Sequence, residues 1–165
     1  MMRYWLAAGF GLTTLFGMDA AFARCGDPPS PGVDWGRCYI EEQDLSTSAL
    51  DGANLREARM NRSNLSGVSL TRADARRAKF VSADLTGANL EGADLRETDF
   101  TNARLRNARM AGADLRRARL FRADLRGADL TGAKLDLTDL LNANLTGAIW
   151  TNGKLCGDGS ISQCK

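Results

Sequence analysis

The chain has 165 residues, of which 44% are hydrophobic and 25% charged, with a formal net charge of +2 and no histidine. The lack of histidine removes the most common general base and the most common transition-metal ligand. The small net charge hides strong local patterning, so the order of the residues carries more information than their totals.

Residues 1–23 have the layout of a secretory signal. Arg3 gives a short basic start, residues 4–17 form an uncharged and mostly apolar run, and A-F-A at 21–23 is an A-x-A cleavage site. The apolar run is too short for an ordinary membrane span. We expect export and cleavage after Ala23, to the periplasm, the exterior or a lumenal compartment. The alternatives are an uncleaved anchor and a buried first helix. Arg24 before Cys25 argues against a lipid anchor.

Residues 24–32, R-C-G-D-P-P-S-P-G, are irregular and contain all three prolines of the chain. Proline cannot donate to a β-ladder, so this segment should lie across the end of the following structure instead of extending it. We therefore expect an N-terminal cap here, because an uncapped repeat end exposes backbone that invites edge pairing.

A five-residue period runs through residues 33–157. Its clearest form is Ala83 to Glu97, written A-D-L-T-G, A-N-L-E-G, A-D-L-R-E. If the leucine is called the centre, centres fall on every residue number divisible by five from Trp35 to Leu155, and all are apolar. A small residue lies two positions before nearly every centre, with Gln43 the one sizeable exception. The period therefore predicts one architecture for the whole segment.

Neither a helix nor a long strand can use this pattern. At 3.6 residues per turn a leucine every five residues would scatter around a helix, and period-2 alternation loses phase at each odd-length repeat. A short extended piece followed by a turn fits, with the small residue and the centre both pointing inward. Glycine two positions after many centres suits turns with positive φ, as at Gly87, Gly92, Gly112, Gly127, Gly132 and Gly147.

The charges indicate how many units form one coil. Positions taken every 20 residues alternate in sign, which favours neighbouring strands stacked in that register because opposite charges across strands attract. Four units would then make one coil. The alternating columns are Lys79, Asp99, Arg119 and Asp139; Glu57, Arg77, Glu97 and Arg117; and Asp84, Arg104 and Asp124.

The A-[DN]-L-x-x unit over residues 33–157 resembles the pentapeptide-repeat family. The resemblance implies an all-β fold, a right-handed quadrilateral β-helix with four units per coil, and hence about six coils at roughly 4.8 Å each. The handedness is implied by the resemblance alone. The tail W-T-N-G-K-L-C-G-D-G-S-I-S-Q-C, residues 150–164, resembles the C-terminal caps of exported bacterial members, and we expect residues 158–165 to form the C-terminal cap. Functions in the family are varied, so the fold does not carry a function.

Four cysteines lie near the two ends of the repeat, and none lies between them. In an exported chain this number suggests disulfides, with three possible connectivities. Bridged Cα atoms must approach within about 7 Å, so cysteines at opposite ends of the solenoid cannot pair. We predict Cys25–Cys38 and Cys156–Cys164, one disulfide in each cap. A four-cysteine zinc site fails for the same reason.

We expect no catalysis, no cofactor and no metal. Carboxylates are plentiful but recur as part of the repeat, and a solenoid without an insertion offers no cleft for an acid pair. Asp74, Asp94 and Asp114 form one column that could suggest calcium. The parallel arginine column two residues further on neutralises it, whereas calcium prefers uncompensated oxygens.

A basic belt lies in residues 103–122, which carry seven arginines and one aspartate. Such a cluster could bind an anionic polymer. Its arginines are spread over all four faces and lie between acidic coils, so axial ion pairs are the competing explanation. The belt candidates are Arg104, Arg106, Arg109 and Arg116.

An apolar strip should face solvent on the side that carries Phe80 and Phe100. Exposed apolar patches tend to be contact sites, and arginine and aromatic residues are enriched at interface anchors. Scattered surface hydrophobes are the alternative. The candidate partner surface comprises Val81, Phe121, Leu141 and Leu137, flanked by Arg117, Arg119 and Arg122.

The sequence favours a non-enzymatic, exported scaffold that presents a flat face centred on Phe121 to a protein or envelope partner. A binder of anionic surface polymer is the alternative. Some members of the family mimic DNA and bind topoisomerases, but this slightly basic chain with an export signal departs from that pattern. We expect no nucleic-acid partner, no membrane span after signal cleavage, and a monomer or a dimer formed through a face.

Overall fold

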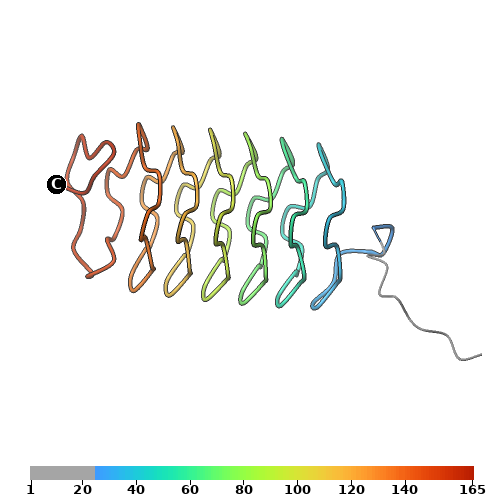
Figure 1. The fold of residues 1–165 in the computed structure, drawn as a ribbon. Coiled ribbons are helices and arrows are strands. Elements are labelled where there is room, and N and C mark those ends of the chain that lie inside the picture. Colours follow the sequence, from blue (N-terminus) through green and yellow to red (C-terminus); the bar gives the residue numbers. More distant parts are fainter. Residues whose placement is uncertain (1–24) are drawn as a thin grey trace, which may run out of the picture.

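The computed structural model describes residues 25–165, so the expected signal and Arg24 lie outside the described residues. The chain winds into a stack of coils that runs from the N-terminal to the C-terminal end of the molecule (Figure 1). Parallel β-bridges join residues 20 positions apart, from Asp34↔Asn54 to Asp129↔Ile149. One turn of the coil therefore takes four five-residue units, and the predicted register of the charged columns is confirmed.

Each unit consists of one bridging residue and a two-residue turn. In the unit of Leu55, the Asn54 N–H donates to the Val33 carbonyl of the previous coil at 2.9 Å, and the Leu55 N–H donates to Asp74 of the next coil at 2.7 Å. The turn is closed by the Ala58 N–H, which donates to the Leu55 carbonyl at 3.0 Å. Bridges isolated by turns replace continuous strands throughout residues 25–165.

The second turn residue has a positive φ in nearly every unit. The glycines expected there adopt it, for example Gly87 at 67°. Many units place a side chain in the same region, for example Arg77 at 59° and Leu137 at 60°. A β-carbon is disfavoured in this conformation, so the coil imposes the turn on residues that would not choose it alone.

The interior is a column of leucine and alanine. Middle-coil centres such as Leu85 and Leu90 are fully buried, and so are the alanines two residues before them. Phe80 and Phe100 stack with ring centroids 5.2 Å apart and an interplanar angle of 9°. The small centre Ala75 is fully buried as well. Burial of these side chains supplies the main stabilisation of the coil.

Hydroxyl residues replace alanine at several inward positions, and the hydroxyl groups of Ser63, Thr98 and Thr138 each donate to a backbone carbonyl. Thr98 Oγ1 donates to the Ala75 carbonyl at 2.8 Å, and Thr138 makes the same bond to Leu115. Ser63 Oγ donates to the Ile40 carbonyl and accepts from the Gln43 N–H at 3.2 Å. In other units the N–H at this position donates directly to the carbonyl three residues before it. Here the Ser63 hydroxyl bridges the Gln43 N–H and the Ile40 carbonyl, and the large side chain of Gln43 remains exposed.

Both caps are closed by the predicted disulfides. Cys25 and Cys38 are joined with Cα atoms 5.5 Å apart, and Trp35 Nε1 donates to the Asp27 carbonyl at 3.2 Å. Cys156 and Cys164 are joined with Cα atoms 4.9 Å apart. These bonds tie residues 25–32 to the first coil and the C-terminal tail to itself.

The C-terminal cap differs from the repeat pattern. Leu155 is 65% exposed, so its expected inward position is wrong. It pairs with Ile149 in an antiparallel bridge, and Ile161 pairs with Asn144 in the same manner. The chain reverses after Trp150 because the turn at Gly153, with φ of 79°, folds Lys154 back to the Trp150 N–H at 2.7 Å.

Within residues 25–165 we find no helix with the length and apolar character that crossing a membrane requires.

Candidate interaction surface

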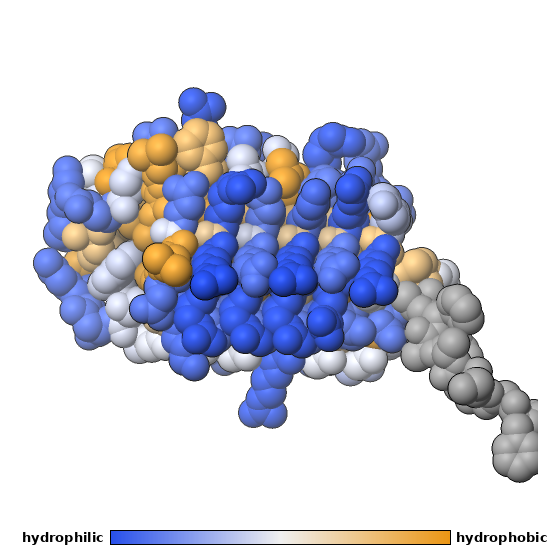
Figure 2. Space-filling view, in the orientation of Figure 1, coloured by the Kyte–Doolittle hydropathy of each residue, from blue (hydrophilic) through white to orange (hydrophobic). Residues whose placement is uncertain are grey.

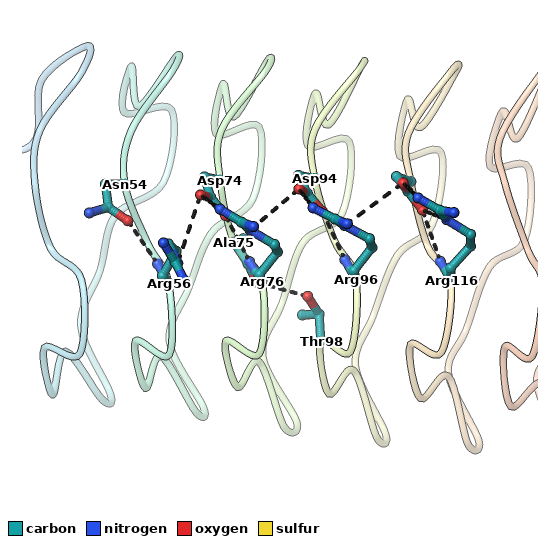
Figure 3. A network of polar contacts seen from close by, with 10 residues as sticks. Asn54, Arg56, Asp74, Ala75, Arg76, Asp94, Arg96, Thr98 and Arg116 are labelled. Carbon is teal, nitrogen blue, oxygen red and sulfur yellow. Dashed lines mark hydrogen bonds and ion pairs between the residues drawn. The ribbon is translucent and has the colours of Figure 1, made fainter.

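A ladder of aspartates and arginines covers one face of the solenoid (Figure 3). Arg76 binds Asp74 of its own unit with two bonds of 2.8 and 2.5 Å, and its Nε lies 3.4 Å from Asp94 of the next coil. Arg96 repeats this arrangement with Asp94 and Asp114. The arginines thus occupy the oxygens that a calcium ion would need.

The ladder lowers the pKa of its carboxyl groups. Hydrogen bonds from Arg76 hold the pKa of Asp74 below its usual value, and those from Arg116 do the same for Asp114. The pKa of Arg76 is raised in turn by its bonds to Asp74. Each carboxylate and its arginine stabilise each other's charged form, as expected for a structural ladder of ion pairs.

The four arginines of the proposed polymer-binding belt all lie in ion pairs. Arg104 is 3.5 Å from Asp84 and Arg106 is 2.5 Å from Asp124. Arg109 pairs with Glu91, and Arg116 lies 2.6 Å from Asp114. Because each cation already has a carboxylate partner, the belt presents less free positive charge than its composition indicates.

The face that carries the stacked phenylalanines in its core has a different surface. Its middle column contains Tyr39, Arg59, Lys79, Asp99, Arg119 and Asp139. The turn before this column ends in Leu137 in the last coil, and the turn after it carries Phe121 and Leu141. We call this side of the molecule the Tyr39–Asp139 face.

Apolar side chains gather at the C-terminal end of the Tyr39–Asp139 face. Leu137 is 78% exposed and Leu141 is 56% exposed, whereas Val81 and Phe121 are half-buried. Figure 2 shows hydrophobic surface concentrated toward this end of the visible side. The exposed part of the predicted strip is therefore the pair Leu137 and Leu141, with Phe121 beside it; we call these three residues the leucine patch.

Cations border the leucine patch. The Arg122 guanidinium lies over the Phe121 ring at 4.9 Å, and Arg119 pairs with Asp99 at 3.2 Å. Among the described residues, no carboxylate lies within 4 Å of the charged nitrogens of Arg117 or Arg122, and Glu97, which precedes Arg117 by 20 residues, pairs with Arg77 instead. These two arginines are available to a partner.

A shallow groove of about 480 Å³ runs beside the patch and is lined by charges of both signs. Arg117, Arg119 and Leu137 form one part of its wall, and Glu97 and Asp99 another. In residues 25–165 no three histidine, cysteine, aspartate or glutamate side chains gather as a metal site would require. The geometry of this open groove suits contact with a partner surface.

Sequence reasoning missed three features of this surface. One is the cation–π contact of Arg59 with Tyr39, at 4.9 Å, which the 20-residue register could have shown. Another is the partial burial of Phe121. The third is the reversal of the chain after Trp150, because the sequence keeps its five-residue period as far as Leu155.

Coils of 20 residues, closed by single-residue bridges and filled with leucine and alanine, define the class of β-solenoid proteins. The model of the family described as pentapeptide repeats matches residues 48–87, 83–120 and 123–157, with eight copies. The chain belongs to the pentapeptide-repeat family.

Solved structures of the family resemble the chain. HetL, a pentapeptide repeat protein involved in heterocyst differentiation regulation in the cyanobacterium Nostoc sp. strain PCC 7120, is 35% identical with a TM-score of 0.56. The match covers 73% of this chain and 60% of HetL, so the chain spans less than two thirds of that protein. A pentapeptide repeat protein from the Arabidopsis thaliana thylakoid lumen is 31% identical, with 68% of each chain covered and a TM-score of 0.48.

A trypsin-treated form of QnrB1, a plasmid-mediated fluoroquinolone resistance protein, is 18% identical with a TM-score of 0.55. That match covers 67% of this chain and 54% of QnrB1 and shows a shared fold. A search of curated proteins gave no match.

Proposed function

We propose that the protein is a non-enzymatic, exported scaffold that binds a protein or envelope partner through the leucine patch. The observation that carries the proposal is the exposure of Leu137 and Leu141 beside Arg117, a cation with no carboxylate within 4 Å in the described chain. Apolar anchors next to an available arginine are the composition of interface centres.

The rest of the solenoid supports a scaffold role. The bridges hold the Tyr39–Asp139 face in a fixed register from the first coil to the last, so the patch is presented on a rigid surface. A rigid surface loses little conformational entropy on binding. We also propose the right-handed coil and the total of about six coils that the family resemblance implies.

Export is supported by the two disulfides, since such bonds persist in oxidising compartments. We propose cleavage after Ala23 and residence in the periplasm, the exterior or a lumen. Expression of the full chain in a bacterium, compartment separation and intact-mass analysis test this. A cytoplasmic product with residues 1–23 retained and four free thiols would contradict it.

The partner surface is tested with Leu137→Ser/Leu141→Ser and a matched control, Tyr39→Ser. Tyr39 is 72% exposed on the same face at the opposite end of the solenoid. Tagged proteins would be crosslinked in the native compartment and their partners identified. We expect the double variant to lose a specific partner that the wild type and Tyr39→Ser both retain. An unchanged partner list for the double variant would refute the proposal.

Binding of an anionic polymer is the competing function. It requires the belt arginines to leave their carboxylate partners, so retention on an anionic resin should be weak and lost at moderate salt. Tight retention that Arg104→Gln/Arg109→Gln abolishes would favour the polymer over a protein partner.

A further inference from the structure

The C-terminal end of the solenoid is capped over only half of its last coil. Each bridging residue and its two neighbours form a short extended segment, which we call a strand here. Residues 160–162 cover the strand 143–145, and residues 154–156 cover the strand 148–150. The two preceding strands of the same coil, 133–135 and 138–140, bridge only to the coil before them. We call these two strands, with their turns, the open edge, residues 133–141.

The two capped strands use one hydrogen-bond pattern. The Leu145 N–H donates to Ser160 at 2.8 Å, and the Ser162 N–H donates back to Ala143 at 2.9 Å. In the next strand the Trp150 N–H donates to Lys154 at 2.7 Å, and the Cys156 N–H donates to Ala148 at 2.8 Å. The end of this solenoid therefore accepts an antiparallel strand in a defined register.

The open edge presents the same atoms without partners. By the pattern of the capped strands, the Leu140 N–H and the Thr138 carbonyl would hold one added strand, and the Leu135 N–H and the Ala133 carbonyl another. Among residues 25–165 no backbone or side-chain group bonds to these four atoms or to the Leu137 N–H. Leu135 and Leu140 are only partly buried, whereas middle-coil centres are fully covered.

The charge of the open edge is net negative. It contains Lys134, Asp136 and Asp139, and within the described chain no cation lies within 4 Å of either carboxylate. Arg116 pairs with Asp114 of its own unit, and Arg119 pairs with Asp99 of the preceding coil. A basic residue opposite Asp139 would complete the cross-strand pairing that the inner coils show.

We propose that the open edge binds an extended segment of a partner protein in which apolar and basic residues alternate. The segment adds antiparallel to 138–140 by β-strand addition. Its apolar side chains cover Leu140 and Thr138, its basic side chain faces Asp139, and Leu137 and Leu141 flank it. This site lies at the end of the solenoid and does not rest on the proposed function of the Tyr39–Asp139 face.

A second copy of the chain is a poorer occupant. Pairing of the open edge with itself would bring Asp136 and Asp139 of both copies together, and like charges across strands are unfavourable. The half-cap also projects beside the open edge, since residues 154–162 lie beyond the last coil.

The test uses an acetylated and amidated peptide, Val-Lys-Val-Lys-Val, with the full oxidised protein. Two-dimensional amide NMR and hydrogen exchange would be recorded with increasing peptide. We expect saturating shifts confined to residues 133–141 and amide exchange of Leu140 slowed by about tenfold or more. The peptide Val-Glu-Val-Glu-Val should bind at least about tenfold more weakly, because its charge opposes Asp139.

Asp139→Asn should weaken the lysine peptide several-fold, and Asp129→Asn is the matched control. Asp129 occupies the same unit position and accepts the Thr131 N–H at 2.9 Å, as Asp139 accepts the Leu141 N–H at 3.0 Å. Its strand is covered by Ile149 of the next coil. Equal effects of the two variants, or shifts away from residues 133–141, would overturn the proposal.

Amide protection that depends on protein concentration and not on peptide would also overturn it, by showing that a second copy covers the edge. If the variant Leu137→Ser/Leu141→Ser kept the same partners as the wild type, the proposed function would be refuted, and the peptide result would be unaffected. The two proposals therefore fail separately.

Discussion

Replacement of Asp114 by asparagine isolates the contribution of the charged ladder. The substitution keeps the side-chain oxygen that accepts the Arg116 N–H, at 3.3 Å, and removes the negative charge. Asp114 receives bonds of 2.8 and 2.6 Å from the Arg116 guanidinium, and Arg96 lies 3.9 Å away. The perturbation is therefore electrostatic, with little change in shape.

We expect Asp114→Asn to lower the free energy of unfolding by about 1 kcal/mol at neutral pH. A hydrogen-bonded pair with a charged group contributes roughly 1.5–3 kcal/mol when protected from water. The Arg116 side chain is 42% exposed, which reduces the figure toward the range of surface pairs. The Asp114 side chain is only 17% exposed, so the expected loss stays above the smallest values found for surface ion pairs.

The pH dependence supplies an internal check. The pKa of Asp114 is lowered in the folded protein, so its stabilisation is fully present above the unfolded pKa of about 3.9 and is lost as pH falls through the folded pKa. The wild type and Asp114→Asn should differ at pH 5 to 7, and the difference should shrink as the pH falls below the unfolded pKa of about 3.9 and vanish below the folded pKa of Asp114.

Urea unfolding of the oxidised protein, followed by far-ultraviolet circular dichroism, measures the difference. The control is Asp139→Asn, which also keeps its turn bond but, in the described chain, has no cation within 4 Å. It should change stability by less than about 0.5 kcal/mol. Equal losses for the two variants, or a loss for Asp114→Asn that does not shrink as the pH falls below about 3.9, would refute the ladder argument.

Three further changes test the core, the turns and the cap in the same unfolding assay. Phe100→Ala should cost about 3–5 kcal/mol because it removes one ring of the buried stack, and a loss below 1.5 would show that Phe80 refills the space. Leu137→Gly should stabilise the protein by about 0.5–1 kcal/mol, because it removes an exposed side chain whose β-carbon is strained at a φ of 60°. Any destabilisation would mean that the Leu137 side chain is covered. Cys156→Ser/Cys164→Ser should cost roughly 2–3 kcal/mol, and an unchanged midpoint after reduction of the wild type would contradict this.

The regular part of the fold could be predicted because the apolar period and the charge pattern both indicate the same coil. Leu85, Leu90 and Leu95 give the inward positions, and the sign of Lys79, Asp99 and Arg119 gives the 20-residue register. The period excludes helices and long strands, so few architectures remain. The disulfide pairs followed because the solenoid separates its ends by more than a disulfide can span.

The irregular part could not be predicted from the period. Leu155 continues the numbering of the centres, yet it lies outside the core because the turn at Gly153 reverses the chain. Phe121 follows its centre, as solvent-facing residues were expected to, but it is half-buried and lies under Arg122. Both outcomes depend on neighbours that the sequence does not place side by side.

In a solenoid with regular columns of alternating charge, a residue that interrupts the alternation and gains no contact of its own is a candidate for binding. The column of Glu57, Arg77, Glu97 and Arg117 calls for an acid in the last coil, and Leu137 stands there instead. It leaves Arg117 without a carboxylate within 4 Å in the described chain, exposes 78% of its own surface and holds φ at 60°. The lost ion pair and the exposed apolar side chain are both unfavourable in the isolated molecule, which supports our proposal that a partner covers this position.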